Sequence, residues 1–374
     1  MIVGYDAKRA FWNRRGLGNF SRDLIRLMEN YFPEHKYLLF TPKRQNAPFS
    51  PDSNGATTIQ PSAMFDKLVP AYWRSYGMLR DIKHQRLDIY HGLSQELPYG
   101  IRSTGVKSVV TIHDAIFVRY PELYDPAYRF IFTKKNRYSC RIANRIVAIS
   151  EQTKRDCIEF FGADEAKIDV VYQGCSSIFR NEVTLDEMAD VRKKYSLPQQ
   201  FLLSVGAIET RKNMGVILDA MHQGKIDMPL VIVGGATSYL TELQKKINIY
   251  SLDSQVIFLH KAIFADFPAM YHAASCMIYP SLFEGFGLPI LEALCTGTPV
   301  ITSQGGCFEE TGGDAALYID PMNADELADV IQRVLSDSRL RKEMIDKGLQ
   351  HAELFADEQV AHNMMQVYSN LMKE

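Results

Sequence analysis

No uninterrupted apolar run in this 374-residue chain approaches the length of a membrane-spanning helix. Charge of one sign is also lacking, because 42 basic residues nearly balance 44 acidic ones and leave a formal net charge of -2. The first absence argues against an integral membrane protein, and the second against a nucleic-acid-binding protein, which needs a strongly basic surface. Residues 1–6 have the pattern of a β-strand rather than of a secretory signal. We therefore expect a cytoplasmic globular protein.

Several short motifs are absent as well. The six cysteines are scattered without paired spacing, which fits reduced thiols in packed positions better than a disulfide framework or a zinc site. No Asp-x-Asp pair occurs anywhere in the chain. Neither half of the chain has Gly-x-Gly-x-x-Gly directly after its first predicted strand, which argues against a nicotinamide-dependent oxidoreductase. We therefore expect no bound cofactor.

Apolar segments of strand length recur along the chain and alternate with helical patterns, which is typical of parallel sheets covered by helices. The pattern breaks after residue 171, where a polar stretch to about residue 200 contains one predicted helix, 185–195. A chain of 374 residues is long enough for two domains with separate cores. We predict an α/β protein with two Rossmann-like domains, residues 1–175 and 176–356. The predicted strands are 2–5, 37–41, 57–60, 89–91, 108–112, 146–149 and 169–172, followed by 201–205, 230–233, 256–259, 277–279, 300–302 and 317–319.

The most informative stretch is 279–299, which follows a predicted strand and then opens a helix. Gly285 and Gly287 let the backbone turn and approach a ligand, and the free N–H groups of a helix start favour an anion such as phosphate. Glu284 and Glu292 flank this turn, and a carboxylate beside a phosphate is repelled unless it faces hydroxyl groups. A phosphate together with hydroxyl groups indicates a sugar nucleotide.

The segment F-E-G-F-G-L-P-I-L-E-A, with seven residues between Glu284 and Glu292, resembles the signature of the retaining GT-B glycosyltransferases, family 4 in particular. Taken alone, the glycines could serve only a tight turn, and Glu292 could be an ordinary first-turn glutamate stabilised by the helix dipole. The resemblance extends over nearly the whole chain. It implies the GT-B arrangement, with a cleft between the two domains and a last helix, 357–374, that joins the first domain.

A second segment of this kind, S-V-G-A-I-E-T-R-K-N at 204–213, places adjacent cations after a strand end, where they suit a diphosphate that gains negative charge as the glycosidic bond breaks. Adjacent basic residues are also common on protein surfaces. The resemblance implies that Arg211 and Lys212 hold the diphosphate with the nearby backbone, that Glu284 binds sugar hydroxyls and that Glu292 binds the ribose. The donor-binding residues implied in this domain are Gly206, Phe286, Gly287, Leu288 and Glu292.

In the first domain, residues 14–18 read R-R-G-L-G and precede a predicted helix over 19–31. A glycine-rich loop at a helix start can approach a diphosphate or a bound sugar, although a simple turn is the alternative. Family members carry a similar loop that faces donor and acceptor. The resemblance therefore makes Gly16 and Gly18 donor-binding candidates.

The segment T-I-H-D at 111–114 brings His113 to the carboxyl end of a buried strand, the edge at which open α/β sheets bind ligands. A histidine that only makes structural hydrogen bonds is the alternative. The resemblance implies that His113 lies beside the reacting sugar, and it leaves the role of Asp114 open. Ser150 is most simply a helix N-cap. The catalytic candidates are His113, Arg211, Lys212 and Glu284.

The resemblance implies an enzyme that transfers a sugar from a nucleoside-diphosphate donor to a hydroxyl of a glycan or lipid-linked acceptor, with retention at the anomeric carbon. The overall pattern resembles bacterial mannosyltransferases of surface-polysaccharide assembly, so GDP-mannose is the first expected donor. We expect no metal requirement, because Arg211, Lys212 and a helix N-terminus can supply the compensating charge. Two alternatives stay open, a nucleotide-sugar epimerase and a non-catalytic sugar-nucleotide-binding protein.

Residues 64–86 are rich in aromatic and basic side chains, including Phe65, Tyr72, Trp73 and Tyr76. An amphipathic helix packed on the sheet explains this pattern, and we favour that interpretation. Peripheral contact with the inner face of a membrane, near a lipid-linked acceptor, is the alternative.

Overall fold

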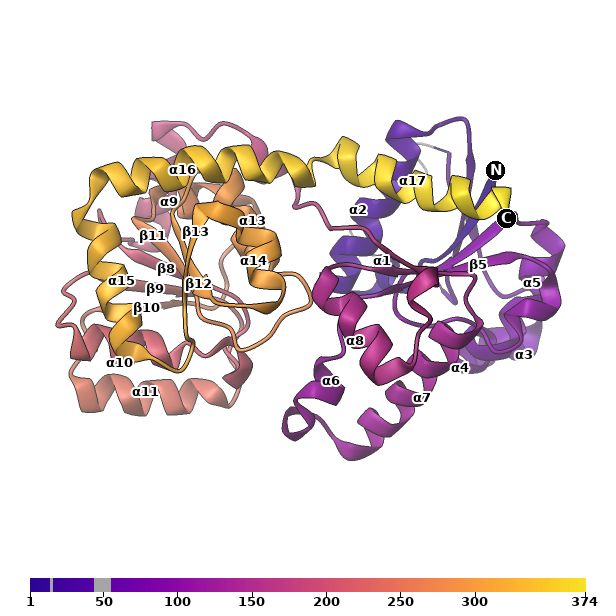
Figure 1. The fold of residues 1–374 in the computed structure, drawn as a ribbon, viewed down its shortest axis with the longest axis horizontal. Helices are drawn as coiled ribbons and strands as arrows, with labels where there is room; N and C mark the ends of the chain where they lie inside the picture. The colour runs from indigo at the N-terminus through magenta and orange to yellow at the C-terminus, as the bar shows by residue number, and fades with distance from the viewer. Residues whose placement is uncertain (14–15, 44–54) are drawn as a thin grey trace. The chain divides into compact units, whose positions relative to one another are not determined.

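The computed structural model describes residues 1–13, 16–43 and 55–374. The chain folds as two compact units (Figure 1), of which unit 1 comprises Met1–Gln173 and Asp357–Glu374, and unit 2 comprises Gly174–Ala356. Each unit contains one parallel β-sheet with helices on both faces. The predicted α/β class with two Rossmann-like domains is confirmed.

The sheet of unit 1 has the order β3-β2-β1-β4-β5-β6-β7, and all its strand pairs are parallel. Sequence analysis predicted every one of these strands to within two residues at each end. Their bounds are Ile2–Asp6 (β1), Lys36–Phe40 (β2), Thr57–Ile59 (β3), Ile89–Gly92 (β4), Lys107–Ile112 (β5), Arg145–Ala148 (β6) and Ile168–Val170 (β7).

Successive residues of these strands are buried on opposite faces of the sheet. Val109 packs into the core that contains the first and last helices, and its neighbour Val110 packs into the core on the other face. Both faces are therefore apolar, which is why the strands appear in the sequence as continuous apolar runs. The first face is covered by α1 (Lys8–Trp12), α2 (Gly16–Tyr31) and α17 (Asp357–Lys373), and the second by α5 (Met78–Gln85), α7 (Pro126–Ile142) and α8 (Glu151–Phe161).

Helix α17, the last of the chain, packs on α2 and contributes to the core of unit 1. Met364, Tyr368 and Leu371 are almost fully buried there. The hydroxyl of Tyr368 lies 2.7 Å from Nδ1 of His91, a residue of β4. Unit 1 is therefore built from both ends of the chain.

The sheet of unit 2 has the order β10-β9-β8-β11-β12-β13, again all parallel. Its strands, also predicted from the sequence, are Leu202–Val205 (β8), Leu230–Val233 (β9), Val256–Leu259 (β10), Cys276–Tyr279 (β11), Val300–Ser303 (β12) and Ala316–Ile319 (β13). One face is covered by α10 (Gly215–Gln223), α11 (Tyr239–Tyr250) and α15 (Ala324–Ser336) (Figure 1). The other face carries α9 (Leu185–Tyr195), α12 (Phe267–Ala273), α13 (Leu288–Cys295), α14 (Gly306–Gly312) and α16 (Ser338–Ala352).

Two helix predictions differ from the structure. The helix expected over 19–31 begins at Gly16, so Gly16 and Gly18 lie in the first turn of α2 rather than in a loop. Glycine is unfavourable in a helix, which is why the sequence suggested a loop, but a Cβ on Gly18 would lie 1.9 Å from the carbonyl oxygen of Asn13. Gly18 therefore permits close packing of the preceding segment, whereas Gly16 has open space around it. Arg14 and Arg15 of the same motif lie outside the described residues.

The second difference concerns residues 64–86, which do not form the expected single helix. They form α3 (Met64–Leu68), α4 (Pro70–Tyr72), a π-helical turn (Trp73–Gly77) and α5. Only the part from Trp73 onward packs into the core, through Trp73, Met78 and Ile82. The expected single helix is interrupted at Pro70, which lies at the start of α4 and cannot continue the preceding helix.

In the described part of the chain, no helix combines the length and the apolarity needed to cross a membrane. All six cysteines are free thiols, as predicted, and only Cys295 is partly exposed.

Candidate functional site

The carboxyl edge of the unit 2 sheet brings the predicted donor-binding residues together. The strand order reverses between β8 and β11, and ligands of open α/β sheets bind outside the strand ends at such a reversal. Because parallel strands end at the same edge, the loop after β8 meets the loop after β11. Lys212 and Glu284 are thus in direct contact although 72 residues separate them in the sequence.

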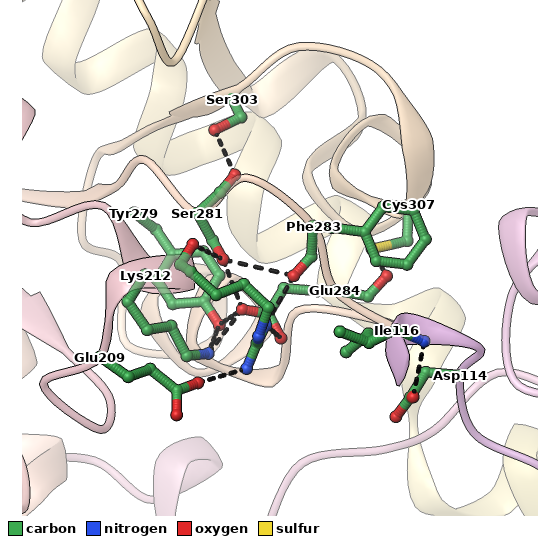
Figure 2. A network of polar contacts seen from close by, with 11 residues as sticks. Asp114, Ile116, Glu209, Lys212, Tyr279, Ser281, Phe283, Glu284, Ser303 and Cys307 are labelled. Carbon is green, nitrogen blue, oxygen red and sulfur yellow. Dashed lines mark hydrogen bonds and ion pairs between the residues drawn. The ribbon is translucent and has the colours of Figure 1, made fainter. Parts of the chain in front are cut away.

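Four side chains converge on the carboxylate of Glu284 (Figure 2). Nζ of Lys212 lies 2.6 Å from Oε1, and a guanidinium nitrogen of Arg211 lies 2.6 Å from Oε2. The hydroxyls of Ser281 and Tyr279 donate to Oε1 at 2.6 and 2.9 Å. The Glu284, Lys212 and Arg211 side chains are only 11 to 13% exposed, so this network is held largely away from water. We call these five residues the Glu284 network.

The Glu284 network holds ionised groups close to charge balance. Burial alone would raise the pKa of Glu284, but the charges of Lys212 and Arg211 and the hydrogen bonds it accepts lower that pKa to about 2. Burial lowers the pKa of Lys212, and the Glu284 carboxylate counteracts that effect. Arg211 also pairs with Glu209 at 2.6 Å. Two cations thus face two carboxylates, so a diphosphate that binds the cations must replace some of these contacts.

Two glycines shape the strand ends beside Lys212. Gly206, directly after β8, has a φ of +146°, and a Cβ there would lie 3.4 Å from Cε of Lys212. Gly234, directly after β9, is so close to Gly206 that a Cβ would lie 1.7 Å from the Gly206 carbonyl oxygen. The missing side chain of Gly234 lets the backbone after β8 lie directly against the end of β9, and the positive φ of Gly206 favours glycine there. The predicted residue Gly206 is therefore adjacent to the Glu284 network.

The glycine-rich turn leads into α13. Gly287 precedes the helix with a φ of +98°, which accounts for glycine at that position and confirms the predicted turn. The helix begins at Leu288, one residue earlier than expected. Phe286 is buried against the ring of Phe355, and its carbonyl accepts a hydrogen bond from Thr311 at 2.5 Å. Because its side chain is in the core, Phe286 can contact a ligand only through its backbone.

Glu292 lies on α13 and is partly buried. Its Oε2 accepts a hydrogen bond of 2.8 Å from the hydroxyl of Tyr271, which lies on α12. Burial raises the pKa of Glu292 to about 7, against the opposing effects of the Tyr271 hydrogen bond and the Lys212 charge. The carboxyl is therefore divided between its neutral and ionised forms near neutral pH.

His113 follows β5 at the carboxyl edge of the unit 1 sheet, as predicted. Its Nε2 donates to the carbonyl oxygen of Leu93 at 2.9 Å, and its ring is nearly perpendicular to that of Phe20, with the ring centroids 4.6 Å apart. Burial lowers its pKa to about 4, so the imidazole is neutral at pH 7. Because Nε2 carries the proton of the neutral ring, Nδ1 is unprotonated and can accept a hydrogen bond. Its role toward a sugar stays a prediction.

Two neighbouring polar residues have structural partners. Oδ1 of Asp114 accepts from the backbone N–H of Ile116 at 3.1 Å (Figure 2), in the turn that starts the next helix. Ser150 caps α8 by accepting from the backbone N–H of Thr153 at 3.0 Å, which confirms that prediction. Of the predicted site residues, Gly16, Gly18 and His113 thus lie in unit 1, and the others lie in unit 2.

Sequence analysis missed several residues that the fold brings to these edges. In unit 1, Arg74 makes a two-nitrogen contact with Asp6 at the end of β1, at 2.6 and 3.0 Å, and lies 3.4 Å from Glu96. An acidic residue directly after the apolar strand 2–5 was the one available signal. In unit 2, Tyr271, Tyr279, Ser281 and Glu209 were also missed. Among the residues that the structure describes, no group of three His, Cys, Asp or Glu side chains could hold a metal ion.

Two family models match the chain, one to each half. The model described as Glycosyltransferase Family 4 matches residues 14–176, and the model described as Glycosyl transferases group 1 matches residues 188–351. The chain belongs to glycosyltransferase family 4. The resemblance to glycosyltransferases that the segment containing Glu284 and Glu292 indicated is therefore confirmed.

Curated relatives of this glycosyltransferase include mannosyltransferases of O-antigen synthesis. It is 28% identical over 375 residues to O-antigen chain mannosyltransferase B of Escherichia coli, a match that covers 95% of this chain and 96% of the relative. It is 29% identical over 234 residues to O-antigen chain mannosyltransferase RfbU of Salmonella typhimurium, covering 60% of this chain and 62% of that protein.

Solved structures share the fold of the whole chain. HepE of Anabaena, crystallised in complex with UDP, aligns with a TM-score of 0.75 at 17% identity, over 99% of each chain. A glycosyltransferase of Rickettsia africae aligns with a TM-score of 0.78 at 18% identity, over 100% of this chain and 98% of the other. At these identities the likeness shows the GT-B fold of the glycosyltransferase and nothing about its substrates.

Proposed function

We propose that this glycosyltransferase transfers mannose from GDP-mannose to a hydroxyl group of a glycan or lipid-linked acceptor, with retention and without a divalent metal. The observation that carries the proposal is the Glu284 network, which joins two cations and a carboxylate at the carboxyl edge of unit 2. The choice of mannose and of surface polysaccharide as the product rests on the named relatives, which act in O-antigen synthesis.

The cations of the network would bind the diphosphate of the donor. Arg211 and Lys212 now contact Glu284 at 2.6 Å each, and the donor phosphates would take over part of these contacts. Charge-assisted hydrogen bonds to phosphate are among the strongest polar interactions in proteins. The Glu284 carboxylate would then accept hydrogen bonds from sugar hydroxyls, which are the only donors that a mannose ring offers.

The transfer itself needs charge stabilisation more than a protein base. The bond between the anomeric carbon and the phosphate oxygen breaks, the acceptor oxygen bonds to that carbon, and the acceptor proton passes to the leaving phosphate. Preorganised cations stabilise the charge that develops on the diphosphate and therefore act chiefly in the transition state. Because Arg211 and Lys212 would supply this charge, we expect no metal requirement. His113, neutral at pH 7, would orient a sugar hydroxyl rather than remove a proton.

The remaining contacts position the nucleotide. The backbone of residues 286–288, at the start of α13, would present N–H groups to the diphosphate, since the Phe286 side chain is buried. Glu292 would accept a hydrogen bond from a ribose hydroxyl, a role that its ionised form can fill.

The proposal is tested by incubating the enzyme with GDP-mannose and a panel of other nucleotide sugars, together with mannose-containing acceptors, in the presence and absence of a chelator. We expect release of the nucleoside diphosphate only from GDP-mannose, an α-linked product by NMR spectroscopy and no effect of the chelator. Transfer from another donor, a β-linked product, or loss of activity that added magnesium restores would each contradict one part of the proposal. Conversion of the donor into an isomeric nucleotide sugar without acceptor would instead indicate the epimerase.

A further inference from the structure

One part of unit 1 exposes large apolar side chains to solvent. Met64, Phe65 and Leu68 of α3 are 73, 58 and 74% exposed. The tyrosines Tyr72 and Tyr76 that follow are 43 and 49% exposed. Contiguous exposed apolar side chains are unusual on a soluble surface and mark an interaction site. We call Met64, Phe65, Leu68, Val69, Tyr72 and Tyr76 the α3–α4 surface.

Helix α3 is oriented with its apolar side outward. The residue that α3 buries is Asp66, which is 2% exposed, whereas Met64, Phe65 and Leu68 face solvent. This is the reverse of an ordinary surface helix, whose apolar stripe faces the core. Asp66 lies so close to Gly77 that a Cβ there would be 2.6 Å from its Oδ1. The polar side of α3 is therefore docked, and its apolar side is presented.

The rest of the segment holds the α3–α4 surface in place. Trp73 is fully buried and donates its Nε1–H to Asp81 at 2.6 Å, which fixes the turn that follows α4. Packing contacts link α3, α4, the π-helical turn and α5, which lie beside one another in unit 1 (Figure 1). The exposed apolar side chains of the α3–α4 surface thus belong to a segment that is packed on the rest of unit 1.

A row of aromatic rings extends from this surface toward α7. Consecutive ring centroids are 4.5 to 5.6 Å apart along the row; the rings of Tyr72 and Tyr76 are tilted by 30°, and those of Tyr76 and Tyr99 are stacked. The rings belong to Phe65, Tyr72, Tyr76, Tyr99 and Tyr138. Tyrosine is enriched where an apolar phase meets water, because its ring is apolar and its hydroxyl is polar.

The charges around the α3–α4 surface have one sign. Between residues 61 and 86, the two acidic side chains, Asp66 and Asp81, are both buried. The basic side chains exposed in that range are Lys67, Arg80, Lys83 and Arg86. A surface that combines exposed apolar side chains with exposed cations complements an anionic lipid headgroup region.

We propose that the α3–α4 surface docks this glycosyltransferase on an anionic lipid bilayer. Met64, Phe65 and Leu68 enter the boundary between headgroups and acyl chains, the tyrosines lie at headgroup level, and the cations contact lipid phosphates. A second copy of the chain is a poorer occupant, because a symmetric dimer would bring the same cations face to face. This inference concerns where the enzyme works and does not depend on the identity of the donor sugar.

The test is flotation of the full-length protein with vesicles of phosphatidylcholine alone and of phosphatidylcholine mixed with phosphatidylglycerol. We expect binding to the mixed vesicles, weakened by salt. The triple variant Met64→Gln/Phe65→Gln/Leu68→Gln should lose about tenfold or more in vesicle affinity. Replacing Lys67 and Lys83 by Gln should cost about fivefold per cation, the equivalent of about 1 kcal/mol each.

The matched control is Leu185→Gln/Ile249→Gln/Met322→Gln in unit 2, where three side chains are 76 to 80% exposed. This variant removes similar apolar area and should bind vesicles like the wild type. All variants should keep the wild-type melting temperature and the wild-type turnover of a soluble acceptor, because the substituted side chains are exposed. Failure of the folded wild type to bind the mixed vesicles would overturn the inference, as would equal losses in the control. A wild-type dimer that the α3 variant converts to a monomer, without vesicle binding, would show that a second copy covers the surface.

Discussion

The sheets of the two units share the order of their first six strands, to which unit 1 adds a seventh, but they differ at the edge where ligands bind. In unit 1 the first strand ends in Asp6, which is 2% exposed and holds Arg74 in a close ion pair. In unit 2 the first strand ends at Val205 and is followed directly by Gly206, and the cations Arg211 and Lys212 come from the next turn, where they share Glu284. Arg74 also lies 3.4 Å from Glu96, which pairs with Lys135 at 3.0 Å, so both edges carry two cations and two carboxylates. They differ in that the first strand of unit 1 ends in a carboxylate, whereas a glycine follows the first strand of unit 2 and both cations come from the next turn. The sheet provides the edge, and the loop after its first strand decides what that edge can bind.

The largest expected effect is on turnover after removal of a cation from unit 2. Lys212→Ala and Arg211→Ala should each lower kcat by about two to three orders of magnitude, since a preorganised donor to a developing anion contributes about that much. Donor binding should weaken less than kcat falls. The control is Lys245→Ala, an exposed lysine on α11, which should turn over like the wild type. If steady-state kinetics show that neither cation variant loses more than about threefold in kcat, the assignment of Arg211 and Lys212 to the diphosphate is wrong.

The second prediction compares the carboxylates of the two edges. Glu284→Gln should lower the free energy of unfolding by about 3 kcal/mol, because it leaves two buried cations poorly paired. A nucleoside diphosphate should then raise the melting temperature of this variant more than that of the wild type, since the phosphates would replace the lost charge. Glu96→Gln, the matched change beside Arg74 in unit 1, should show no such gain. A Glu284→Gln protein that no longer responds to nucleotide would contradict the proposed exchange of contacts.

A smaller effect should appear as a pH dependence of stability that belongs to unit 2. Glu292 has a folded-state pKa of about 7, raised by burial from an ordinary value of 4.5. Between these values the folded protein keeps a proton that the unfolded chain releases, so stability falls as pH rises through this window and levels off above pH 7. The contribution is about 2 kcal/mol after allowance for partial exposure. Chemical denaturation across this range should show a flatter profile for Glu292→Gln than for the wild type.

The pH prediction has its own control in Tyr271, which donates to Glu292. Tyr271→Phe removes a hydrogen bond that favours the ionised form, so the upper end of the window should move to higher pH. If Glu292→Gln retains the wild-type slope, another group is responsible and the assignment to Glu292 is wrong.

Most of the fold could be predicted from the sequence because its strands are buried on both faces. Val109 and Val110 pack on opposite sides of one sheet, and the resulting apolar run identifies the strand without any knowledge of its neighbours. The turn at Gly287 was predictable for a similar reason, since its positive φ leaves a local requirement for glycine.

What could not be predicted depends on contacts between distant segments. The pairing of Glu284 with both cations joins residues about 70 positions apart, and the motif spacing suggested separate roles for them. Likewise, the apolar residues of α3 show a helical pattern, but that pattern does not reveal that the apolar side of the helix faces solvent while Asp66 faces the core. Gly18 was assigned to a loop because only the approach of Asn13 reveals why glycine is needed inside a helix.

We propose that the donor diphosphate binds at the Glu284 network of unit 2 and not at the Asp6–Arg74 pair of unit 1. The most direct measurement is calorimetric titration of GDP into Arg211→Ala and Arg74→Gln, each verified as folded by circular dichroism. Removing a charged hydrogen-bond partner of the phosphates should weaken GDP binding by about tenfold or more in Arg211→Ala, and Arg74→Gln should bind GDP like the wild type. Equal losses in the two variants, or a loss confined to Arg74→Gln, would contradict the account.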